Sequence, residues 1–170
     1  MRTIKIILGV ISFLTLIFFA TGLLVKETTY TTEVVVNKPV EEVFTAFNNI
    51  ENTKKWIPEI KSIDTIQSNF VKTGSIYQIV LTNQGEEITM TEKVMAYVPN
   101  EKLTIFYDAE NMLKTNDYVF TENKGITTIT LRAICTSESY IMACVFPYFK
   151  NTFLEQDKAY LTNFKRFVEQ

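Results

Sequence analysis

The sequence predicts an α+β fold in which a curved antiparallel sheet of about seven strands packs around a long C-terminal helix, preceded by a transmembrane helix. Three observations support this prediction. Residues 6–25 carry no charge, residues 60–135 alternate between polar and apolar side chains, and residues 140–168 have the apolar spacing of a helix. We expect two units, a membrane anchor over residues 1–27 and one globular domain over residues 28–170.

Composition excludes several classes of function. Hydrophobic residues make up 46% of the 170 residues and charged residues 21%, which is typical of a folded chain. The net charge of -2 and the lack of any Lys/Arg cluster argue against nucleic-acid binding. Because the chain has no His, it cannot use Ser-His-Asp or Cys-His catalysis, and we expect no metal site. The five glycines are too scattered for a phosphate-binding loop, so we expect no cofactor.

The uncharged run from Ile6 to Val25 is long enough to cross a bilayer, since a helix needs about 20 apolar residues for that. Arg2 and Lys5 precede the run and only Lys26 follows it, which favours a cytoplasmic N-terminus and an extracytoplasmic domain. The alternative is a cleaved signal peptide with a cut near residues 20–22. An apolar run that continues past this position fits an uncleaved, single-pass anchor better.

The elements that follow are predicted in order along the chain. Residues 28–37 form a β-rich stretch, and Pro39 stands where a helix places its first residue. Residues 40–47 then place their apolar side chains on one helical stripe, and residues 51–56 form a second short helical turn. Six strands follow, at about 60–69, 75–83, 86–97, 101–109, 114–122 and 125–136, joined by short turns. Consecutive strands should therefore pair antiparallel.

The last predicted element is the amphipathic helix of residues 140–168. Pro147 lies inside this pattern. Either the helix begins at Pro147, or an earlier turn is kinked against it.

This order of elements resembles the helix-grip fold of the START-like, polyketide cyclase/dehydrase (SRPBCC) superfamily, which includes lipid-transfer domains and plant pollen allergens. The resemblance spans about residues 28–170, and it is carried by Val34–Phe47, Trp56-Ile-Pro-Glu59, Phe146-Pro-Tyr-Phe149 and Leu161–Phe167. It implies a cavity between the sheet and the long helix that binds lipids, sterols or polyketides, with catalysis in only some members.

Side chains from three predicted strands and the C-terminal helix are candidates to line such a cavity. They are Tyr77, Ile79, Leu81, Met90, Glu92, Leu103, Ile105 and Tyr107 on the strands, and Phe149, Phe153, Gln156 and Tyr160 on the helix. Aromatic side chains could equally fill the space. The leading hypothesis is a membrane-anchored binding protein for a hydrophobic small molecule or lipid. The alternatives are a cyclase/dehydrase-type or hydrolytic enzyme, and an interaction module with a filled core. The oligomeric state stays open.

Glu92 is the catalytic candidate, because it shares a strand face with Met90 and Val94 and could act as a general acid or base. The more economical interpretation is that a bulge returns Glu92 to solvent, or that it pairs with a Lys or Arg. Asp117 and Arg132 lie opposite the apolar parity of their strands, so we expect both to be solvated.

The two cysteines, Cys135 and Cys144, flank the junction between the last strand and the C-terminal helix. An extracytoplasmic domain would permit a disulfide between them if the geometry allows it. Two buried free thiols are the preferred interpretation, because Cys135 lies on the apolar face of its strand.

Overall fold

A computed structural model describes residues 2–83 and 85–170. Its seven-stranded antiparallel sheet has the order β1-β7-β6-β5-β4-β3-β2. The strands are β1 (Thr28–Val36), β2 (Ile60–Gln67), β3 (Ile76–Asn83), β4 (Glu86–Val98), β5 (Lys102–Ala109), β6 (Met112–Asn123) and β7 (Ile126–Thr136). Strands β2 to β7 pair consecutively as a meander, and β1 lies at the edge of the sheet beside β7. The predicted fold class is confirmed, and β6 begins two residues earlier than the alternation had indicated.

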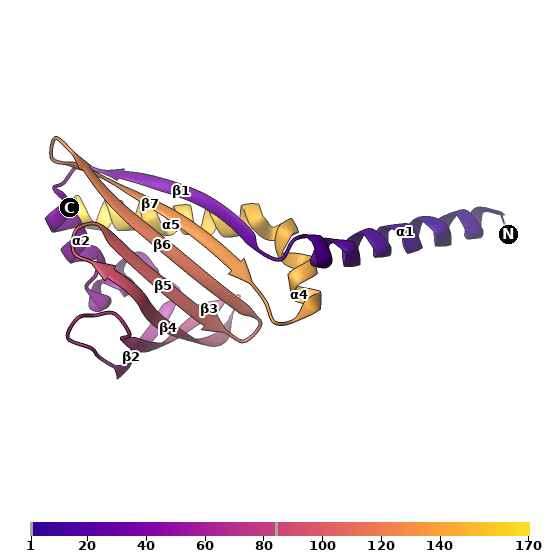
Figure 1. Cartoon of the computed structure of the whole chain (residues 1–170), viewed down its shortest axis with the longest axis horizontal. Helices are drawn as coiled ribbons and strands as arrows, with labels where there is room; N and C mark the ends of the chain where they lie inside the picture. Colours follow the sequence, from indigo (N-terminus) through magenta and orange to yellow (C-terminus); the bar gives the residue numbers. More distant parts are fainter. Residues whose placement is uncertain (1, 84) are drawn as a thin grey trace.

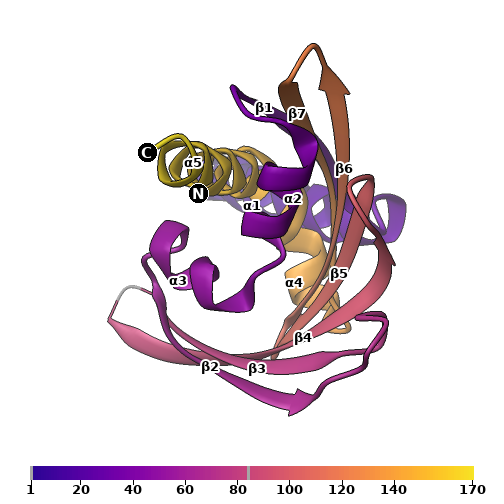
Figure 2. The same ribbon diagram turned by 90° about the vertical axis from the view of Figure 1, so that its left-hand side faces the viewer.

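The sheet curves around helix α5 (Lys150–Val168), as the end-on view shows (Figure 2). Helix α2 (Val40–Phe47), a 3-10 turn η1 (Ile50–Asn52) and helix α3 (Thr53–Trp56) lie on the same concave side. The core between these layers is rich in aromatic side chains. Phe47, for example, packs against Trp56, Tyr118 and Phe164 with ring centroids 4.9 to 5.2 Å apart.

Pro147 divides the C-terminal helical pattern into three pieces. Helix α4 (Tyr140–Val145) is followed by a 3-10 turn η2 (Phe146–Phe149), and α5 begins only at Lys150. Proline lacks the N–H that a continuous helix requires, so an α-helix cannot run through this position undisturbed. As a result α4 turns away from the axis of α5 (Figure 1). Of the two predicted possibilities, the second is observed: an earlier helical segment, α4, is kinked against the long helix, which begins at Lys150 and not at Pro147.

Helix α1 (Arg2–Leu24) extends from one end of the domain (Figure 1). Within the described residues it is the one helix long and apolar enough to cross a membrane. Its side chains are almost entirely exposed, in contrast to those of a core helix. Its last turns contact the domain through α4 and η2.

Both cysteines are buried free thiols. Burial raises the pKa of the Cys135 thiol, which keeps it protonated and poorly reactive. Cys144 lies where α4 meets α1. Arg132 is exposed as expected. Asp117 is only half-buried on the outer face, where Lys102 lies 3.0 Å from its carboxylate.

Candidate functional site

A cavity of about 670 Å³ lies between the sheet, α3, α4 and α5. This volume falls within the range of small-molecule sites, roughly 300–1,000 Å³. Most of the lining side chains are apolar, and they come from strands β2 to β6 and from the C-terminal helices. The aromatic side chains therefore do not fill the space that the curved sheet encloses.

Nine of the twelve residues predicted from the sequence line this cavity. They are Ile79, Leu81, Met90, Glu92, Tyr107, Phe149, Phe153, Gln156 and Tyr160. The other three, Tyr77, Leu103 and Ile105, are buried further along the same strands and line an adjacent space of only about 40 Å³. The alternation of side chains along each strand identified the correct face of the sheet for these three residues. It could not show which part of that face is covered by α2.

Glu92 is buried, with 5% of its surface exposed. The interpretation that a bulge returns it to solvent is wrong, because the β3–β4 register stays regular past Glu92 and the irregularity on β4 falls between Val94 and Ala96. Desolvation raises the pKa of Glu92 to about 7, partly offset by a hydrogen bond from the Tyr107 hydroxyl. A carboxyl with this pKa can donate or accept a proton near neutral pH.

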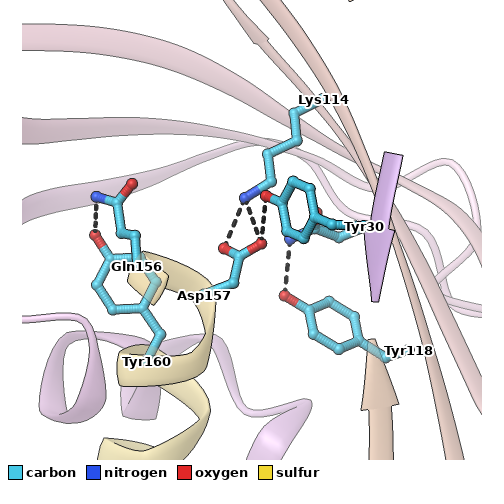
Figure 3. Close-up of polar contacts among 7 residues, drawn as sticks. Tyr30, Lys114, Tyr118, Gln156, Asp157 and Tyr160 are labelled. Atoms are coloured by element: carbon cyan, nitrogen blue, oxygen red, sulfur yellow. Dashed lines mark hydrogen bonds and ion pairs between the residues drawn. The ribbon is translucent and has the colours of Figure 1, made fainter. Parts of the chain in front are cut away.

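A buried ion pair, which the sequence did not reveal, forms a second polar group in the wall. Lys114 Nζ lies 2.6 Å and 2.8 Å from the two carboxylate oxygens of Asp157, and the Tyr30 hydroxyl donates to the same carboxylate at 2.7 Å (Figure 3). Burial and the Asp157 charge hold the pKa of Tyr30 far above its ordinary value. The pair joins β6 to α5 and contributes no net charge to the cavity.

These residues could not have been selected from the sequence alone. Lys114 stands near the start of a strand and Asp157 lies within a helix rich in polar residues, so each resembles an ordinary surface residue. The one available signal was that Asp157 lies four residues after Phe153 and three before Tyr160, on the stripe of the predicted helix that faces the cavity. The sequence around Lys114 and around Asp157 does not indicate that the two side chains form a pair.

Further hydroxyl and amide groups line the wall. Asn116 donates to the Tyr118 hydroxyl at 2.9 Å. Gln156 donates to the Tyr160 hydroxyl at 2.8 Å (Figure 3). Burial keeps the pKa values of Tyr118 and Tyr160 well above the ordinary value, so both hydroxyls stay neutral.

Three buried polar atoms among the described residues have no hydrogen-bond partner: Trp56 Nε1, Glu59 Oε2 and Asn116 Oδ1. All three residues line the cavity. A buried polar atom without a partner is unfavourable, so each is available to a ligand or to water. The described residues hold no group of three or more Cys, Asp or Glu that could bind a metal ion.

Comparisons with known proteins agree with this architecture. The chain is similar to the aromatase/cyclase ZhuI from Streptomyces sp. R1128, with a TM-score of 0.71 at 12% identity over 84% of this chain and 94% of that one. It is similar to TTHA0849 from Thermus thermophilus, with a TM-score of 0.66 at 14% identity over 82% and 96%. A third similar structure is Ara h 8.0201, with a TM-score of 0.65 at 14% identity over 84% and 97%.

At these identities the structural matches show the fold alone. None of the curated protein sequences matches the chain. The family model described as polyketide cyclase/dehydrase and lipid transport matches residues 27–137, which is more than half of the chain. The chain therefore belongs to the polyketide cyclase/dehydrase and lipid transport family.

Proposed function

We propose that this chain is a membrane-anchored binding protein for a hydrophobic small molecule held between the sheet and α5. The cavity is the observation that carries the proposal, because it is large, mostly apolar and not closed by its own side chains. A cavity of this size also argues against the alternative of an interaction module, because that alternative assumes a filled core. Helix α1 supplies the proposed anchor over residues 6–25 of the unit 1–27, and residues 28–170 form the binding domain.

The wall favours a neutral ligand with a hydroxyl or carbonyl group. Lys114 is neutralised by Asp157, so no free cation within the described lining is available to an anionic head group. Asn116 Oδ1 needs a donor and Trp56 Nε1 needs an acceptor, which a hydroxyl can satisfy. Above pH 7 an ionised Glu92 would in addition repel an anion.

Trp56 is the single tryptophan of the chain and lines the cavity, so its fluorescence can report on ligand binding. We would titrate the full chain in detergent with dodecanol and, separately, with dodecanoate, which have the same chain length, and follow the Trp56 emission at about pH 8. We expect a saturable change at lower concentration with the neutral alcohol. No saturable change with either molecule would contradict the proposal, and tighter binding of the anion would overturn the assignment of a neutral ligand.

A cyclase/dehydrase-type or hydrolytic enzyme is the second candidate, supported by the buried Glu92 and its pKa of about 7 beside the Tyr107 hydroxyl. In that case Glu92 would transfer a proton to or from the bound molecule. Glu92→Gln should then retain binding and lose turnover. Turnover that survives this substitution would remove the candidate.

A further inference from the structure

We propose that α4 and η2, residues 140–149, form a second membrane-embedded segment that lies against α1 in the outer part of the bilayer and opens the cavity toward the lipid. This inference rests on the proposed anchoring by α1 and extends it. The partner of this segment is a lipid bilayer, since α1 would bring the bilayer into direct contact with α4.

Composition is the first argument. Between Glu138 and Lys150 the chain carries no charged residue, just as α1 carries none between Lys5 and Lys26. Four side chains of this segment are large and exposed: Tyr140 at 43%, Ile141 at 61%, Tyr148 at 59% and Phe149 at 49%. An apolar surface of this kind beside a membrane-spanning helix fits burial in the headgroup and acyl boundary.

The contact with α1 is the second argument. The Phe18 ring stacks on Tyr148 and the Phe19 ring stacks on Tyr140, each with centroids 6.2 Å apart. The Tyr140 hydroxyl donates to the Phe19 carbonyl at 2.5 Å, and the Tyr148 hydroxyl lies 2.9 Å from the Thr21 hydroxyl. Polar groups within a bilayer need partners inside the protein, and α1 provides them for both tyrosines.

Close packing of small residues is the third argument. A Cβ atom added to Gly22 would lie 2.4 Å from Cys144 Sγ, so the two helices approach as closely as a glycine permits. Small residues at such contacts are typical of helix pairs in membranes. Gly22 lies three residues before Val25, where the uncharged run ends. At a rise of roughly 1.5 Å per residue, the contact therefore lies about 5 Å inside that run along the helix axis. Helix α4 would therefore meet α1 below the bilayer surface.

The same segment forms part of the cavity wall through Met142, Val145, Phe146 and Phe149. The exposed lining residues Asn83, Glu110, Asn111, Phe149 and Gln156 mark where the cavity reaches the surface. The Ser137 hydroxyl, just before α4, donates to the Asn111 carbonyl at 2.5 Å, which ties the β5–β6 turn to this end. With α4 in the bilayer, an apolar ligand could pass from lipid to cavity without crossing bulk water.

Fluorescence quenching in vesicles tests the proposal. The full chain would be reconstituted in phosphatidylcholine vesicles with brominated acyl chains, as Leu14→Trp, Ile141→Trp and Phe70→Trp variants, with the emission of the parental chain subtracted. Leu14 reports on α1, Ile141 on α4, and Phe70 on the β2–β3 connection at the far end of the domain (Figure 1). We expect strong quenching at positions 14 and 141 and none at position 70.

The outcomes separate the two proposals. Quenching at position 14 without quenching at 141 would overturn the embedded α4 and leave the anchor intact, whether α4 then faces water, a second copy or another protein. A lack of quenching at position 14 would overturn the anchor itself, and with it this inference. In the Ile141→Trp background, Gly22→Leu should at least halve the quenching by forcing the helices apart. Gly9→Leu, which has open space around it, should leave the quenching unchanged.

Discussion

At the scale of single residues, the distinctive feature of this chain is the placement of ionisable groups in an apolar wall. Among the described residues, no Lys or Arg pairs with the buried Glu92, whereas Asp157 is buried with Lys114. Burial disfavours an unpaired charge, and a close partner compensates for it. The two carboxylates should therefore respond differently to pH and to substitution.

Glu92 should make the stability of the chain depend on pH. Its pKa is raised from 4.5 to about 7, so the protonated form stabilises the fold below pH 4.5, and this contribution is lost as the pH rises through 7. Glu92→Gln stays neutral and should be more stable than the parental chain at about pH 8, by up to ~3 kcal/mol. This advantage should vanish near pH 4.5.

Urea unfolding of the full chain in detergent, followed by Trp56 fluorescence across this pH range, measures the effect. Glu87→Gln on the same strand is the control, because Glu87 is exposed and pairs with Lys61. An equal difference between Glu92→Gln and the parental chain at both ends of the range would contradict the buried, protonated Glu92.

The Lys114–Asp157 pair should tolerate loss of both members better than loss of one. Asp157→Leu leaves a buried ammonium and a Tyr30 hydroxyl without their acceptor, and we expect it to lower the free energy of unfolding by about 3–5 kcal/mol. Lys114→Met combined with Asp157→Leu should recover most of this loss. Lys102→Met, in the more exposed pair with Asp117, should change it by less than about 1 kcal/mol. Equal effects of Asp157→Leu and Lys102→Met in urea unfolding would contradict the assignment.

At the scale of elements, the boundaries could be predicted wherever periodicity and turn residues act locally. The helix of residues 40–47 and the strand order agree with the structure because Pro39 and the Gly-containing turns mark the ends. Gly125, for example, takes a positive φ of 77° between β6 and β7. The packing of α4 against α1 could not be predicted, since it depends on contacts between segments far apart in the sequence.

The candidate site likewise has one part that the sequence could predict and another that it could not. Parity on each strand placed Ile79, Leu81, Met90 and Glu92 on the correct face. The ion pair, the limit of the cavity near α2, and the polar atoms without partners all depend on which elements meet in three dimensions. A sequence pattern describes one element at a time, so it cannot supply that information.

The hydroxyl of Thr127 should stabilise the connection from β1 to α2. Thr127 on β7 is fully buried and donates to the Lys38 carbonyl at 2.7 Å. Thr127→Val keeps the shape and removes the donor, so it should lower the free energy of unfolding by about 1 kcal/mol. Thr128→Val, on the opposite face of the same strand, serves as the control. Urea unfolding that gives the same value for both variants would show that this bond contributes nothing.

At the scale of the whole molecule, the basic residues that flank the apolar run predict a domain outside the cytoplasm, because Arg2 and Lys5 precede the run and only Lys26 follows it. Phe70 is fully exposed on the β2–β3 connection and both native cysteines are buried, so Phe70→Cys provides one reactive thiol. A membrane-impermeant maleimide should label this variant in intact cells and leave the parental chain unlabelled. Labelling only after the membrane is permeabilised would reverse the predicted orientation.

The central claim is that the cavity holds an apolar molecule, and native mass spectrometry of the full chain purified from its own membranes tests it most directly. Annular lipids around α1 are separated from a cavity ligand by two variants, Leu81→Trp in the cavity wall and Val119→Trp on the exposed face of β6. We expect a stoichiometric apolar adduct on the parental chain and on Val119→Trp, and none on Leu81→Trp. The same adducts on all three chains, or none on any, would contradict the claim.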